Sequence, residues 1–276
     1  MRHIDTKYAL TALADLLLPR TCIVCGRTLQ VNERHVCLFC LADLPYTGFE
    51  HRIHNPMADK FNALIAKHLS EIQPQRTEEG DGRGNCRKQA GLCTENGPEE
   101  RSREPYAYAA ALYFYSHEAG YRQIQYQLKY KGNTDVGKLF GGILGARIAS
   151  GRHFGSVDAV IPVPLHWTRK FRRGYNQAEI IAKAIAGHLG APLRTDILVR
   201  KRKTKTQTKL DVEAKARNVA GAFSVRPETD ACGIGHILLV DDVFTTGSTL
   251  FACFMALRKA FPAPLRISVA CLGFVG

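Results

Sequence analysis

The amino-acid sequence predicts an α/β protein built on a mostly parallel sheet with helices on both faces. From residue 106 onward, short apolar runs alternate with amphipathic stretches of about ten to fifteen residues, the pattern of strands and helices in turn. The run Ile237–Val240 is purely apolar, as expected of a strand buried on both faces. With 45% hydrophobic and 23% charged residues over 276 positions, the composition is that of a globular protein.

The elements of this domain are expected in the following order. Strands are predicted at 106–115, 157–163, 197–199, 237–240 and 265–272, and helices at 120–129, 135–149, 176–189 and 248–261. The second helix contains Gly137-Lys138 and Gly141-Gly142, but it lacks the Gly-x4-Gly-Lys-Ser/Thr order, so a P-loop is excluded.

Four regions are expected along the chain. They are an N-terminal helix and cysteine knuckle (1–46), a helical connector (47–71), an insertion (72–104) and the α/β domain (105–276). The insertion is poor in large apolar residues, so we predict that it is disordered or loosely packed. Its Cys86 and Cys93 fit stray loop cysteines better than a second metal site.

The first twenty residues include an apolar stretch, Ala9–Leu18. Asp15 interrupts it and it is too short to cross a bilayer, so no membrane insertion is expected. Leu17-Leu18-Pro19-Arg20 is not a small-residue cleavage site, which favours an amphipathic helix over a signal peptide.

Four of the nine cysteines form two Cys-x-x-Cys pairs, Cys22/Cys25 and Cys37/Cys40, with eleven residues between the pairs. Two such turns can supply four thiolates to a tetrahedral Zn²⁺. A closed shell leaves no position for water, which indicates a structural ion, although His35 could replace one thiolate. A redox-active Cys-x-x-Cys is the alternative. In either case thiols in place of disulfides favour a cytoplasmic location.

The segment 237–250 joins a strand, an acidic pair, a small-residue turn and a helix start. Thr245, Thr246, Gly247, Ser248 and Thr249 offer backbone N–H groups at a helix N-terminus, which suits a phosphate. Asp241 and Asp242 could accept hydrogen bonds from ribose hydroxyls or hold Mg²⁺. An ordinary helix capped by Ser248 or Thr246 explains the hydroxyls but not the two adjacent acids.

The net charge of +13 is concentrated between 166 and 209, where twelve Lys and Arg face two acids. Two basic bursts stand out, and we interpret both as loops. The first contains Arg169, Lys170, Arg172 and Arg173. The second runs from Arg200 to Lys209 and includes Lys201, Lys203 and Lys205. Such charge implies a polyanionic partner, either a phosphorylated small molecule or nucleic acid, rather than a merely solvated surface. For the second burst, a lid over an anionic ligand and a contact for single-stranded DNA both remain open.

The segment 237–250 resembles the motif with which type I phosphoribosyltransferases bind phosphoribosyl pyrophosphate (PRPP). The resemblance implies that fold for the α/β domain. It also implies that Asp241 and Asp242 contact the ribose hydroxyls, and that residues 245–249 hold the 5′-phosphate. In such a fold, the first basic burst lies where the pyrophosphate binds, with Arg172 and Arg173 stabilising its charge as it departs.

Over residues 16–70 and 106–276 the chain also resembles the ComF family of competence proteins. Three features carry this: the cysteine knuckle, the block Pro-Val-Pro…Arg-Arg-Gly-Tyr-Asn-Gln, and the block Lys-Thr-Lys-Thr-Gln-Thr…Arg-Asn-Val-Ala-Gly-Ala-Phe. Membership implies a link to DNA uptake and natural transformation. Two hypotheses follow: an Mg²⁺-dependent phosphoribosyltransferase with an unidentified acceptor, or a non-catalytic module that binds single-stranded DNA or competence proteins and keeps the PRPP site as a sensor or relic.

Overall fold

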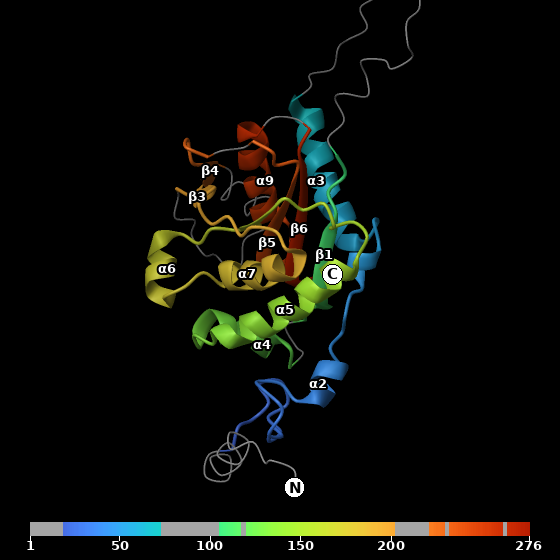
Figure 1. Cartoon of the computed structure of the whole chain (residues 1–276), viewed down its shortest axis with the longest axis vertical. Helices are drawn as coiled ribbons and strands as arrows, with labels where there is room; N and C mark the ends of the chain where they lie inside the picture. The colour runs from blue at the N-terminus through green and yellow to red at the C-terminus, as the bar shows by residue number, and fades with distance from the viewer. Residues whose placement is uncertain (1–18, 73–104, 117–119, 202–220, 230–231, 262–263) are drawn as a thin grey trace, which may run out of the picture.

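The computed structural model describes residues 19–72, 105–116, 120–201, 221–229, 232–261 and 264–276 (Figure 1). The helix expected before residue 19, the insertion from residue 73 onward, and Lys203 and Lys205 lie outside the described residues. In the described part of the chain, no helix has both the length and the apolar character that a bilayer crossing needs.

The expected parallel sheet is confirmed. Its strands lie in the order β1 (Ala109–Phe114), β6 (Arg266–Phe274), β5 (His236–Phe244) and β2 (Ala159–Pro162), and every neighbouring pair is parallel. A second sheet pairs β3 (Leu198–Arg200) with β4 (Phe223–Val225) in antiparallel fashion. β3 lies one residue beyond the predicted strand. β4 was not predicted, because three residues are too few for an alternation to show.

Helices cover both faces of the parallel sheet, as predicted (Figure 1). Alternate strand side chains belong to two separate cores, because successive residues of a strand point to opposite faces. One core contains α3 (Pro56–Ile72) and α9 (Ser248–Ala260). The other contains α4 (Arg122–Tyr130), α5 (Thr134–Ser150) and α7 (Gln177–Leu189). The remaining helices are α2 (Leu38–Ala42), the 3₁₀ turn η1 (Phe49–His51) and α6 (Trp167–Arg173).

Two expectations about the segments near the carboxyl edge of the sheet are wrong. The first basic burst is the helix α6, not a loop: the His166 side chain accepts from the Thr168 N–H at 3.3 Å, and Gly174, at φ +80°, ends the helix. The strand predicted to end at Val240 continues to Phe244. It does so because β6 extends equally far and pairs with it as far as Phe274.

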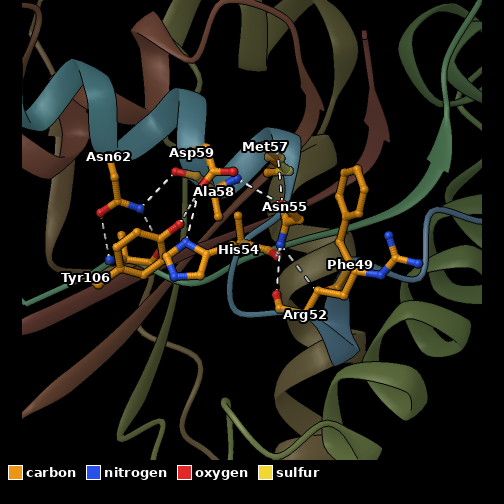
Figure 2. A network of polar contacts seen from close by, with 11 residues as sticks. Phe49, Arg52, His54, Asn55, Met57, Ala58, Asp59, Asn62 and Tyr106 are labelled. Carbon is orange, nitrogen blue, oxygen red and sulfur yellow. Dashed lines mark hydrogen bonds and ion pairs between the residues drawn. The ribbon is translucent and has the colours of Figure 1, made fainter.

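The segment expected as a helical connector forms part of one layer of the domain. Asn55 fixes its position at the start of α3 (Figure 2). Its Oδ1 accepts from the N–H groups of Met57 at 3.1 Å and Ala58 at 2.9 Å, which caps the helix. Its Nδ2 donates to the carbonyls of Arg52 at 3.0 Å and Ala109 at 3.1 Å, so the same side chain ties α3 to β1.

A second asparagine, about two helical turns further along α3, makes a similar connection to the same part of the chain. Asn62 exchanges two hydrogen bonds with the backbone of Ala107, each 2.9 Å long, in the way that a neighbouring strand would (Figure 2). Tyr106 adds a bond from its hydroxyl to Asp59 Oδ1 at 2.7 Å. The start of β1 is therefore held by side chains of α3.

Replacing Asn55 by Ala should lower the free energy of unfolding by about 3 kcal/mol, because it removes a cap and leaves buried carbonyls unpaired. Asn133→Ala is the matched control, since Asn133 caps α5 through a single bond to the Val136 N–H at 3.4 Å; it should cost about 1 kcal/mol. Chemical denaturation measures both, and equal losses would contradict the proposed tie.

Candidate functional site

The acidic pair Asp241–Asp242 lies at the carboxyl end of β5, where ligands of open α/β sheets bind. The two carboxylates point to opposite faces, because they are consecutive residues of a strand. Asp241 is two residues after Leu239 and therefore shares its face of the sheet, toward the core that contains α9. Asp242 is two residues after Val240 and shares its face, toward the core that contains α4. Each carboxylate therefore meets a different layer of the protein.

Asp242 is held by two residues of α4. Lys129 Nζ lies 2.8 Å from Asp242 Oδ2, and the Gln125 side-chain amide donates to the Asp242 carbonyl at 3.2 Å and to the Tyr113 hydroxyl at 3.3 Å. Burial disfavours the charge on Lys129, but Asp242 outweighs it, so the pKa of Lys129 is raised. Lys129 and Gln125 were not among the predicted site residues; their four-residue spacing on one predicted helix was the available signal.

The environment of Asp241 favours its protonated form. Burial, followed by the like charge of Asp242, raises the pKa of Asp241 to about 7. The Asp242 N–H, which donates to Asp241 Oδ1 at 2.8 Å, and the charges of Lys129 and Arg200 act in the opposite direction. Arg200 reaches the site from the end of β3, where its guanidinium stacks 5.1 Å from the Phe223 ring.

The turn after β5 requires glycine at position 247. Gly247 has φ +76°, and a Cβ there would lie 2.7 Å from Phe244 Cζ and 3.1 Å from Leu64 Cδ1 of α3. Gly247 is also the N-cap of α9 and provides no side-chain cap, so the alternative with Ser248 or Thr246 as N-cap is wrong. Thr246 instead shares a hydrogen bond of 2.8 Å with Ser248 through their hydroxyls. Backbone N–H groups at the positive end of the helix dipole thus adjoin the acidic pair, an arrangement suited to an anion.

The four basic residues of α6 divide into two pairs. Arg173 lies 5.7 Å from the Tyr130 ring of α4 and donates to Gln177 Oε1 at 3.0 Å. Burial and the charges of Arg173 and Arg172 lower the pKa of Arg169. The charge of Arg169 in turn contributes to lowering the pKa of Arg200. Arg169 and Arg173 thus lie toward the site. The other two, Lys170 and Arg172, are exposed.

Cys22, Cys25, Cys37 and Cys40 converge into one cluster, as predicted, with all four Sγ atoms within 4.8 Å of one another. Four thiolates around a tetrahedral Zn²⁺ stand about 3.8 Å apart, and the Sγ atoms of Cys25 and Cys37 are 3.8 Å apart. Among the described residues the set contains thiols alone, so His35 replaces none of them. The cluster is therefore compatible with zinc.

Backbone contacts shape this cysteine knuckle. The Cys37 N–H donates to Cys22 Sγ at 3.4 Å, and Gly26 turns the first pair at φ +74°. The Glu33 carboxylate accepts from the N–H groups of Gln30 and Leu38, both at 2.7 Å. These bonds close the loop that separates the two cysteine pairs.

Comparison with known proteins identifies relatives among competence proteins. The chain is 39% identical over 102 residues to Competence protein F of Haemophilus influenzae, covering 37% of this chain and 44% of that protein. It is 30% identical over 149 residues to DNA utilization protein YhgH of Salmonella typhi, covering 53% of this chain and 64% of that protein. These similarities confirm the resemblance to the ComF family. The matches span less than two thirds of either relative.

No family model matches the chain. Among solved structures, adenine phosphoribosyltransferase of Leishmania tarentolae aligns with 56% of this chain and 76% of its own, at a TM-score of 0.28 and 14% identity. The parallel sheet and the layers of helices rest on the strand pairing described above.

The raised pKa of Asp241 predicts a pH dependence of stability. The unfolded chain loses this proton near pH 4, whereas the native state keeps it until about pH 7, so the native state binds more protons in between. The free energy of unfolding should therefore fall as pH rises from about 4 to 7, by up to about 1.4 kcal/mol per pH unit from this group. Denaturation of Asp241→Asn across this range should show a smaller fall than the wild type.

Asp135→Asn serves as the control, because its hydrogen bond to Lys138 lowers the pKa of Asp135 and keeps that group ionised throughout the window. An identical pH dependence in Asp241→Asn and the wild type would show that Asp241 is already ionised at pH 5.

Proposed function

We propose that this protein binds PRPP at the segment 237–250 and acts in DNA uptake or use, as the names of its relatives suggest. Transfer of the phosphoribosyl group to an acceptor is the reaction that such a site serves. The observation that carries the proposal is the acidic pair Asp241–Asp242 beside the N-terminus of α9, whose N-cap residue is a glycine.

In this proposal the chain's own groups bind the three parts of PRPP. Thr245, Thr246, Gly247, Ser248 and Thr249 hold the 5′-phosphate, and Asp241 and Asp242 accept from the ribose hydroxyls. Arg169, Lys170, Arg172 and Arg173 bind the pyrophosphate, with Arg169 and Arg173 in the inner position. Carboxylate oxygens are suitable ligands for Mg²⁺, which would supply further positive charge beside the pyrophosphate.

Catalysis at such a site would be mainly positioning and electrostatic. The bond from C1′ to the pyrophosphate oxygen breaks, the pyrophosphate leaves with the electron pair, and the acceptor forms the new bond and gives up a proton. Guanidinium groups stabilise the charge that accumulates on the leaving pyrophosphate. Arg172 and Arg173 are the residues proposed for this role.

A second candidate function is non-catalytic binding of single-stranded DNA or of a competence protein, with the PRPP site as a sensor. The basic run that begins at Arg200 and the relative named for DNA utilization favour it. Lys201 directly follows β3, whereas Lys203 and Lys205 lie outside the described residues. Both candidates place the protein in the cytoplasm, with one structural zinc in the knuckle.

Saturating PRPP with Mg²⁺ should stabilise the protein by about 2.7 kcal/mol at a hundred times the dissociation constant. Asp241→Asn combined with Asp242→Asn should abolish this gain, whereas Asp135→Asn on α5 should retain it. Thermal unfolding with and without ligand measures the effect. A wild-type melting temperature that PRPP does not change would rule out the proposed site. If PRPP does stabilise the protein, pyrophosphate release across a panel of nucleobases separates transfer from binding.

Protein purified without chelator should contain one zinc per chain. Cys25→Ser should lose the metal, because it removes one of four thiolates, whereas Cys232→Ser should keep it, since Cys232 is also exposed but lies outside the cluster. Elemental analysis measures the content. Full zinc content in Cys25→Ser would contradict the four-thiolate site.

A further inference from the structure

Exposed aromatic rings gather on the neighbouring helices α4 and α6. Tyr126 is 43% exposed and Tyr130 65% on α4, while Trp167 is 70% and Phe171 90% exposed on α6. No other large hydrophobic side chain in the described residues is as exposed as Phe171. Removing these rings from water by contact with a partner would be favourable, so their exposure indicates a binding surface.

The two helices lie side by side (Figure 1). Arg173 of α6 stacks on the Tyr130 ring, and the hydroxyl of Tyr175, just after α6, donates to the Leu128 carbonyl of α4. Within α4, the rings of Tyr126 and Tyr130 are 5.4 Å apart. Within α6, Trp167 and Phe171 are four residues apart and therefore share one side of the helix. Arg173 is two residues from Phe171 and six from Trp167, so at about 100° per residue it lies on a different side of α6 from these two rings. The pair of rings on α4 and the pair on α6 therefore belong to neighbouring helices but form separate surfaces.

Positive charge accompanies these rings. Neither α4 nor α6 contains an acidic residue. On α4, Lys131 lies over the Tyr126 ring at 5.9 Å. On α6, Lys170 and Arg172 are exposed beside Phe171, and Lys170 Nζ lies 3.7 Å from Glu179 Oε2 of α7. We call the following set on α6 the aromatic-basic face: Trp167, Lys170, Phe171 and Arg172.

This combination fits one partner chemistry best. Single-stranded nucleic acid offers flat unpaired bases that stack on aromatic rings and a chain of phosphates that pairs with Lys and Arg. A duplex hides its bases from such rings. A protein partner would have to match the rings with an apolar patch and the cations with acids. An anionic membrane would attract the same cations but would need a longer apolar surface than the seven residues of α6 provide.

We propose that the aromatic-basic face binds single-stranded nucleic acid, with unpaired bases stacked on Trp167 and Phe171 and phosphates contacting Lys170 and Arg172. The inference deepens the proposed role in DNA use and names the part of DNA that the protein recognises. It requires neither PRPP binding nor the basic run after Arg200, although Lys170 and Arg172 are proposed to contact phosphate groups in both ligands.

Trp167 is the chain's single tryptophan, so its fluorescence reports directly on stacking. Titration with a single-stranded oligothymidylate at low salt should quench the emission. An abasic strand of the same length keeps the phosphates but lacks the bases, so it should bind more weakly and leave the emission unchanged. Duplex DNA and phosphatidylglycerol vesicles complete the panel. Equal quenching by vesicles, or equal affinity for the abasic strand, would overturn the proposal.

Variants assign the two parts of the contact. Trp167→Ala and Phe171→Ala, measured by anisotropy of a labelled strand, should each weaken binding roughly five- to a hundredfold with the salt dependence unchanged. Lys170→Ala with Arg172→Ala should reduce the salt slope by about 0.7 per lost contact. Leu69→Ala is the control: Leu69 is 43% exposed on α3, which covers the opposite face of the sheet.

Stabilisation by PRPP, measured in Trp167→Ala and Phe171→Ala, should equal that of the wild type. Loss of DNA binding with PRPP stabilisation intact supports the assignment. If the wild type binds DNA but not PRPP, the proposed PRPP site at the segment 237–250 is refuted, while the proposed role of the aromatic-basic face is retained. Unchanged DNA affinity in both aromatic variants would refute the face.

Discussion

Two consecutive carboxylates at the end of a buried parallel strand are the constraint on which the surrounding structure depends. Because neighbouring residues of a strand face opposite ways, Asp241 and Asp242 meet different layers of the protein. The fold supplies Lys129 from the α4 layer and Arg200 from the β3–β4 sheet on the other side. Partly buried charges without such partners would cost several kcal/mol. The raised pKa of Asp241 shows that compensation is incomplete, and a cation or hydroxyl donor would complete it.

The anion-binding side of the site depends on the N-terminal half of the chain. Leu64 of α3 and Phe244 leave no room for a Cβ at position 247, so α3 helps to fix the turn that exposes the N–H groups of α9. Asn55 and Asn62 in turn hold α3 against β1. The helix that covers the sheet is thereby coupled to the geometry of the phosphate site. A change in the position of α3 would therefore alter the turn at Gly247, even though no residue of α3 is proposed to contact the ligand.

Local patterns in the sequence predicted the parallel sheet, the cysteine cluster and the position of the acidic pair, because apolar runs and Cys-x-x-Cys spacing act over few residues. The helical form of α6 escaped prediction, since Pro162 and Pro164 before it and the arginines within it suggested a loop, and its cap is a histidine. The extension of β5 to Phe244 depends on its partner strand. Lys129 and Gln125 contact Asp242, more than a hundred residues away in the sequence. Their four-residue spacing places them on one side of a helix, but it does not indicate which residue they contact.

The central claim is that the carboxyl end of β5 and the turn after it form a site for a phosphoribosyl group. A crystal structure with PRPP and Mg²⁺ tests it most directly. The account predicts the 5′-phosphate on the N–H groups of residues 245–249, the ribose hydroxyls at Asp241 and Asp242, and the pyrophosphate toward Arg169 and Arg173. PRPP bound elsewhere on the protein, or a site that stays empty at saturating ligand, would contradict it.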